Sequence, residues 1–151
     1  KFKMEKIELL ENEVLVLRKC KEDFTSYGGF KYPETGLVEA PNWIPDSRAP
    51  DNGLAGILWG CGWFAITLAN PCTYNNICQL IKVNKDDGMI HISNESSGIV
   101  KFKKGEVLLS SSNDKDVIDI LKQYIPIEVM QNGLFLGGSP NGKKYWSNDC
   151  Y

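Results

Sequence analysis

The stretch that decides the fold class is CQLIKVNKDDGMIHI, residues 78–92. Apolar and polar side chains alternate from Cys78 to Asn84, which is the pattern of a half-buried β-strand. Lys85 to Gly88 form a turn in which the Asp-Gly pair supplies positive φ angles, and Met89 to Ile92 return as the partner strand. The stretch therefore predicts an antiparallel hairpin.

Other strands are expected on both sides of this hairpin. Val14 to Arg18 is a β-branched run that predicts a strand, and Ile7 to Val14 before it is compatible with a short helix or a first strand. Gly98 to Phe102 and Glu106 to Ser110 predict a second antiparallel pair across the Lys-Lys-Gly segment between them. A sheet of mostly antiparallel strands follows from these patterns.

The clearest helix signal is Asp114 to Tyr124, which Ser112 or Asn113 caps and Pro126 ends. Its apolar residues recur at helical spacing and form one buried face: Val117, Ile118, Leu121 and Ile125. Ile127 to Met130 and Leu134 to Leu136 predict a final hairpin around Asn132-Gly133. The expected fold class is α+β, with one bent, mostly antiparallel β-sheet and a single main helix (about 114–124) packed on it.

Length and composition limit the classes of function. The 151 residues suit one globular domain, expected over 4–151, with 1–3 as a remnant of an expression vector. Lys plus Arg number 17 and Asp plus Glu 19, so the net charge of −2 disfavours duplex nucleic acid as a partner. Because no apolar run reaches the length of a membrane span and no signal peptide is visible, a membrane is also excluded as a partner.

The five cysteines are odd in number, contain no CxxC pair and are accompanied by one histidine, His91. This pattern predicts free thiols in a reducing cytosol and neither a metal site nor a cofactor. Phosphate-binding glycine loops and the GxSxG nucleophile motif are missing from the sequence. Whether the chain is an enzyme therefore stays open, and a role without catalysis is favoured.

Two segments stand out as candidates for binding. The first, Tyr27 to Asn52, is rich in proline and aromatic residues, and Trp43 within it is either a platform for stacking a planar ligand or a staple of the loop. The second, Ile57 to Leu68, is apolar with interleaved glycines, which suits a strand or turn where something approaches the backbone closely. A cluster of lysines at 101, 103 and 104 is either a solvated edge strand or a contact for an anion.

Three separated blocks resemble a small family of uncharacterised phage and bacterial proteins, whose signature is GF-x-[WY]-P … G-x-V-x-AP-x-W-x-P … G-x-GLHG-x-LWG. The matching blocks are Gly29–Pro33, Gly36–Pro45 and Asn52–Gly60, and Ile99–Val107 is similar to the family's KVKFPRGEV strand pair. The resemblance covers roughly residues 24 to 122. It implies a phage or prophage context, and hence the cytoplasm of an infected or prophage-bearing bacterial cell.

The chain departs from that signature at two places. Ala55 stands where the family has the histidine of GLHG, and Ala49-Pro50-Asp51 replaces a preceding cysteine. The family has no established enzymatic activity, and a histidine at position 55 would be the obvious catalytic or phosphate-contacting group.

The expected function is a non-catalytic small-ligand (nucleotide-like) binding protein, a phage anti-defence sponge that sequesters a host immune nucleotide signal. The alternatives are a nucleotide-processing enzyme (ADP-ribosyl or phosphoryl transfer) or its inactive mutant, and an inhibitor that binds a host protein directly. The expected partner is a small anionic or nucleotide ligand, with a homo-oligomer possible. The predicted pocket lies between the proline-rich residues Tyr32 to Arg48 and the glycine-rich run Gly53 to Trp63, with the Lys101 to Lys104 strand as one wall. Its predicted residues are Tyr32, Trp43, Arg48, Asn52, Gly53, Ala55, Trp59, Lys101 and Lys103.

Overall fold

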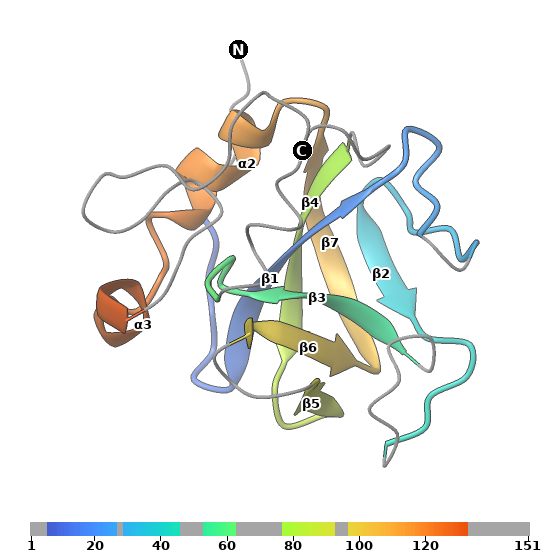
Figure 1. Cartoon of the computed structure of the whole chain (residues 1–151), viewed down its shortest axis with the longest axis horizontal. Coiled ribbons are helices and arrows are strands. Elements are labelled where there is room, and N and C mark those ends of the chain that lie inside the picture. Colours follow the sequence, from blue (N-terminus) through green and yellow to red (C-terminus); the bar gives the residue numbers. More distant parts are fainter. Residues whose placement is uncertain (1–5, 27–28, 46–52, 63–76, 93–96, 133–151) are drawn as a thin grey trace.

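A computed structural model describes residues 6–26, 29–45, 53–62, 77–92 and 97–132 of the chain (Figure 1). Its strands are β1 (Glu13–Cys20), β2 (Gly36–Glu39), β3 (Leu54–Leu58), β4 (Ile77–Asn84), β5 (Met89–His91), β6 (Ile99–Phe102) and β7 (Lys104–Ser111). The helices are α2 (Asp114–Leu121) and α3 (Ile127–Asn132). Neither helix is long and apolar enough to cross a membrane.

The seven strands form one sheet in the order β2-β7-β4-β1-β3-β6-β5, and every neighbouring pair is antiparallel. β1 and β4 lie at its centre and pair along their whole length, from Glu13 opposite Asn84 to Cys20 opposite Ile77. Their apolar side chains are buried on both faces, which explains the nearly continuous apolar runs in these two strands.

The two flanks of the sheet meet at Lys103, which alone separates β6 from β7. The Lys103 carbonyl accepts a 2.8 Å hydrogen bond from the amide of Ala40, just after β2, and its amide donates a 2.8 Å bond to the Gly88 carbonyl, just before β5. β6 and β7 belong to opposite halves of the strand order, so the sheet must bend strongly for the chain to pass directly between them.

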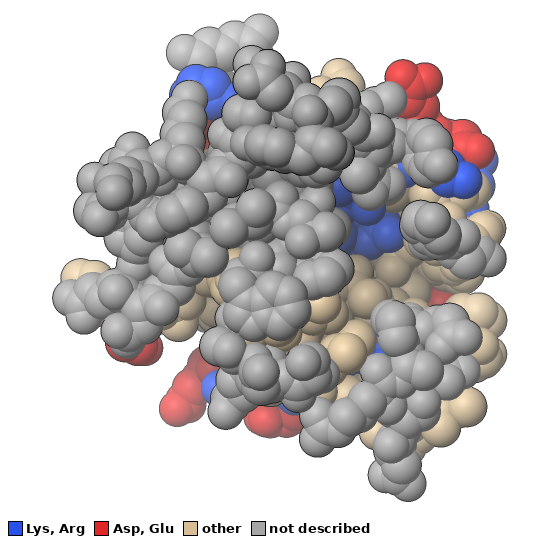
Figure 2. All heavy atoms as spheres, viewed as in Figure 1, with Lys and Arg blue, Asp and Glu red and all other residues tan. Residues whose placement is uncertain are grey.

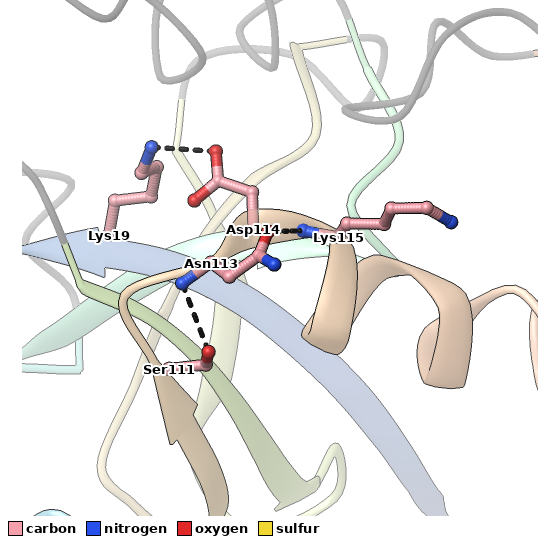
Figure 3. A network of polar contacts seen from close by, with 5 residues as sticks. All are labelled: Lys19, Ser111, Asn113, Asp114 and Lys115. Atoms are coloured by element: carbon pink, nitrogen blue, oxygen red, sulfur yellow. Dashed lines mark hydrogen bonds and ion pairs between the residues drawn. The ribbon is translucent and has the colours of Figure 1, made fainter. Parts of the chain in front are cut away.

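α2 packs on β4 and β7 through Val117, Ile118 and Leu121, the face expected from the sequence. Asn113 is the N-cap, since its side-chain oxygen accepts a 3.1 Å hydrogen bond from the amide of Lys115. Lys19 of β1 forms a 2.8 Å ion pair with Asp114 in the first turn (Figure 3). The predicted helix and one of its two candidate caps are therefore confirmed, although regular α-helix ends at Leu121.

The predicted strand pairings are wrong, although the strands themselves form. β4 does not pair with β5, because its two edges are taken by β1 and β7, and β5 pairs with β6 instead. β6 does not pair with β7, because a single intervening residue is too short for a hairpin turn. The turn before β5 does contain the expected positive φ, +79° at Gly88.

Within the described residues the chain is mostly β-strand with few helices. The expectation of an α+β fold with one antiparallel sheet is therefore confirmed in outline. Ile127 to Asn132 is helical, where a hairpin strand was expected. Pro126 suits the position just before a helix, where its missing N–H costs nothing, so it introduces α3 as well as following α2. Residues 6–10 form neither a helix nor a strand, and the expected strand at 134–136 lies outside the described residues.

Candidate functional site

A buried cation lies at the C-terminal part of β1. Arg18 is 6% exposed and sits opposite Gln79 of β4, which is 0% exposed, so both side chains point to the same face of the sheet. Arg18 Nη1 donates a 2.7 Å hydrogen bond to Gln79 Oε1, and Arg18 Nε donates a 3.3 Å bond to the Ala55 carbonyl. The guanidinium is thus held by neutral acceptors from two neighbouring strands.

Gln79 uses both ends of its amide. Its Nε2 donates 3.0 Å hydrogen bonds to the Pro33 carbonyl and to Ser110 Oγ, while Oε1 also accepts a 3.7 Å bond from the Cys20 thiol. Ser110 Oγ in turn donates a 2.7 Å bond to the Glu34 carbonyl. Gln79 therefore ties β1, β4 and β7 to the segment that leads into β2.

An aromatic ring covers the guanidinium. Arg18 Cζ lies 3.5 Å from the centroid of the Tyr32 ring, and Tyr32 is 3% exposed. The Tyr32 hydroxyl accepts a 3.4 Å hydrogen bond from the Ala55 amide. Burial raises the pKa of Tyr32 and the pKa of the Cys20 thiol, and the nearby Arg18 charge only partly opposes this, so both groups are neutral at physiological pH. We call Arg18, Tyr32, Gln79 and Cys20 the arginine cluster.

A second buried cation lies on β6. Lys101 is 0% exposed, its Nζ donates a 2.8 Å hydrogen bond to the Ile44 carbonyl, and the same atom lies 5.0 Å from the Trp43 ring centroid. A Cβ added at Gly53 would come within 2.7 Å of Lys101 Cγ and 3.0 Å of the Trp43 ring. Lys101 therefore holds residues 43–44 against β6, and the lack of a side chain at Gly53 leaves room for the Lys101 stem and the Trp43 ring.

Ala55 connects the two groups, because it lies opposite Lys101 in the β3–β6 register and binds the arginine cluster through its amide and carbonyl. Beyond β3, Trp59 is 8% exposed and takes a left-handed φ of +57°, a conformation that is uncommon for a residue with a side chain. Its amide donates a 2.8 Å bond to the Leu15 carbonyl, which holds the turn. Burial raises the pKa of the neighbouring Cys61 thiol to about 12.

The structure brings several of the predicted site residues together, with Lys101 buried and Trp43, Gly53 and Ala55 half-buried. Trp43 and Gly53 adjoin Lys101, and Ala55 lies opposite Lys101 in the β3–β6 register. Of the two readings of Trp43, the loop staple fits this arrangement. Tyr32 is packed against Arg18, Lys103 is half-buried at the bend, Trp59 is buried beyond β3, and Arg48 and Asn52 lie outside the described residues.

The sequence interpretation missed Arg18 and Gln79 as polar residues of the interior. No local signal separates Gln79 from the other polar residues of β4, Lys82 and Asn84, which are not buried. The lysine cluster also divides: Lys101 is buried, whereas Lys104 is exposed and pairs with Asp87 at 3.2 Å. In the face shown in Figure 2, acidic and basic side chains of the described residues are interspersed, without a broad patch of one sign. The described residues contain no group of His, Cys, Asp and Glu arranged to hold a metal ion.

The described cysteines, Cys20, Cys61 and Cys78, are free thiols, as expected, and Cys72 and Cys150 lie outside the described residues. Burial raises the pKa of Cys78 as well, so none of the three resembles an activated nucleophile. The cysteines that the structure describes therefore form internal contacts and do not form a nucleophilic site.

Comparison with known proteins shows similarity to bacterial ice nucleation proteins. The chain is 31% identical over 135 residues to one from Enterobacter agglomerans, which covers 87% of this chain and 10% of the relative. It is 33% identical over 127 residues to ice nucleation protein InaU of Pantoea ananas, covering 82% and 12%. It is 36% identical over 96 residues to one from Pseudomonas fluorescens, covering 64% and 7%. No family profile and no solved structure matches the chain.

The chain thus spans about a tenth of the length of the curated relatives it matches. These relatives show that the resemblance to an uncharacterised phage family is wrong, because they are bacterial proteins named for ice nucleation. The nucleotide sponge, the nucleotide-processing enzyme and the inhibitor of a host protein are wrong for the same reason. The expected small anionic ligand, the exclusion of a membrane and the cytoplasmic location are corrected by the same finding: what this chain is similar to is an ice nucleation protein.

Proposed function

We propose that this chain is a folded, non-repetitive module that supports ice nucleation by a larger protein without itself nucleating ice. The observation that carries the proposal is the asymmetry of the matches: most of this chain corresponds to about a tenth of each ice nucleation protein. In those relatives, the matched region is one small unit of a long chain. Its fold is therefore expected to serve the rest of that chain.

The small size of this fold also supports a role other than ice nucleation itself. A surface that nucleates ice must hold many water molecules in the spacing of the ice lattice, so its effectiveness grows with its extent and regularity. Repetitive architectures supply such surfaces because every repeat presents the same groups. This sequence has no internal repeats, and the longest strands among the described residues have 8 residues, which extend over about 26 Å.

The interior supports a structural role. The arginine cluster and the Lys101–Trp43 contact both use buried polar groups to fix loops onto the sheet, and each joins segments that are far apart in the sequence. Buried networks of this kind rigidify a fold when every member is satisfied. A rigid, self-contained unit is what an attachment or support module requires.

A droplet-freezing assay tests the proposal. Droplets that contain the purified chain are expected to freeze at the same temperature as droplets with an equal mass of an unrelated protein, whereas the full-length Pantoea ananas relative raises the freezing temperature. A chimera of that relative, in which this chain replaces the matched region, is expected to keep the raised freezing temperature. Freezing that the isolated folded chain promotes, and that is lost when the chain is unfolded, would overturn the proposal.

A further inference from the structure

β2 ends the strand order of the sheet on one side, so it has a paired edge towards β7 and an outer edge (Figure 1). Gly36 to Glu39 pair with Val107 to Lys104, and the hydrogen bond from the Ala40 amide to the Lys103 carbonyl continues the same register. In an antiparallel ladder the backbone groups face the partner strand at every second residue. The backbone groups of Ala40 face β7, so those of Val38 and Gly36 face it too. The N–H and C=O groups of Leu37 and Glu39 therefore point outward.

The outer edge of β2 carries exposed side chains. Leu37 is 85% exposed, the highest value among the large apolar side chains of the described residues, and Glu39 is exposed as well. Within the described residues, neither backbone forms an outward hydrogen bond. Unpaired strand edges are templates for a further strand, and an exposed large apolar residue on such an edge favours the addition of one.

The charges at this edge select the kind of partner. Glu34 and Glu39 flank Leu37, and neither carboxylate has an ion-pair partner among the described residues. Lys104, the residue opposite Glu39, already pairs with Asp87 at 3.2 Å. A second copy of this strand would add two more carboxylates to the same edge, and like charges in adjacent strands destabilise pairing. A strand with basic side chains would instead complement the edge.

We propose that β2 is a docking edge that accepts an extended strand from another polypeptide, with an apolar residue opposite Leu37 and a lysine or arginine opposite Glu39. Leu37 and Glu39 lie on the same face, so these two partner residues are two positions apart in its sequence. The backbone bonds to Leu37 and Glu39 would supply affinity, and the two side-chain contacts would supply selectivity. The inference rests on the proposed function, since it names how the module attaches to its partner.

The probe is a synthetic peptide that is labelled for fluorescence anisotropy. Threonine occupies its odd-numbered positions, and lysine, valine and lysine occupy its even-numbered positions in that order. We expect saturable binding, and Leu37→Ala is expected to weaken it about tenfold, as loss of a buried leucine contact does. A peptide with glutamate in place of lysine is expected not to bind the natural chain. Glu39→Lys should weaken binding of the lysine peptide about twofold to fivefold and permit binding of the glutamate peptide.

Backbone modification separates strand addition from simple charge attraction. N-methylation at valine and lysine removes the N–H groups that would face β2 and is expected to abolish binding, whereas N-methylation at threonine leaves them free and is expected to preserve it. Leu37→Pro removes only an outward N–H, so the chain should keep its circular dichroism spectrum and lose binding. Val38→Pro removes an N–H bonded to β7 and should also lower the thermal midpoint.

The proposal fails if the lysine peptide does not bind, if binding is insensitive to the position of N-methylation, or if the folded Leu37→Pro variant binds normally. It also fails if a peptide of residues 34–40 of this chain binds better than the lysine peptide, because the edge would then prefer a second copy. These measurements use no ice. Failure here therefore leaves the droplet-freezing result intact, and the two proposals can be refuted separately.

Discussion

Replacing Gln79 with leucine tests the arginine cluster, because it removes the amide and nearly conserves the side-chain volume. The change leaves Arg18 Nη1 without its 2.7 Å acceptor and the Pro33 carbonyl without its 3.0 Å donor. A buried polar group left without a partner costs about 1–3 kcal/mol, and a charged one more, so the free energy of unfolding should fall by about 3–5 kcal/mol. Cavity formation adds little, because leucine is similar in volume to glutamine.

Urea unfolding followed by circular dichroism measures this loss as a lower midpoint at an unchanged m-value. The Arg18→Met variant and the Arg18→Met, Gln79→Leu double variant complete a cycle. The double variant removes the buried charge together with its acceptor, so its loss of stability should be smaller than the two single losses combined, by at least about 1 kcal/mol. Gln123→Leu, at an exposed position after α2, is the matched control and should change stability by less than about 0.5 kcal/mol.

The reasoning would be refuted by a Gln79→Leu loss below about 1 kcal/mol, or by single losses that add within about 0.5 kcal/mol. The first result would mean that water or another group replaces the amide at no cost. The second would mean that Arg18 and Gln79 are not energetically coupled despite their hydrogen bond.

Leu121→Ala should lower the free energy of unfolding by about 2–5 kcal/mol, because Leu121 is 0% exposed on the buried face of α2. A loss below about 1 kcal/mol in urea titrations would contradict this packing. Lys101→Met should cost about 1–3 kcal/mol, since it leaves the Ile44 carbonyl without its donor, and it should shift the Trp43 fluorescence. Unchanged fluorescence would argue against the contact between Lys101 and Trp43. The pKa of Cys61 rises from its ordinary 9.0 to about 12 on folding, so the folded chain keeps a proton that the unfolded chain releases. The wild type should therefore lose stability relative to Cys61→Ala as the pH rises between these values, by up to about 1.4 kcal/mol per pH unit, and parallel curves for the two proteins would refute the burial of this thiol.

The sequence by itself determined the local elements. The alternation in β4, the β-branched residues of β1 and the cap and apolar face of α2 are each specified by neighbouring residues, so short-range patterns are sufficient to find them. The segment after Pro126 was misassigned because one proline is compatible with the end of one helix and the start of the next.

Only the tertiary structure decided which strands pair and which polar residues lie inside. The partner of β5 depends on whether the edges of β4 are already occupied by β1 and β7, and that is a property of the whole sheet. Arg18 and Gln79 lie 61 positions apart, and Lys101 and Ile44 lie 57 apart, so nothing in either local context identifies the acceptor that permits burial. A lysine or arginine in a strand is exposed by default, and it becomes part of the interior only where distant segments bring carbonyl oxygens and aromatic rings to it.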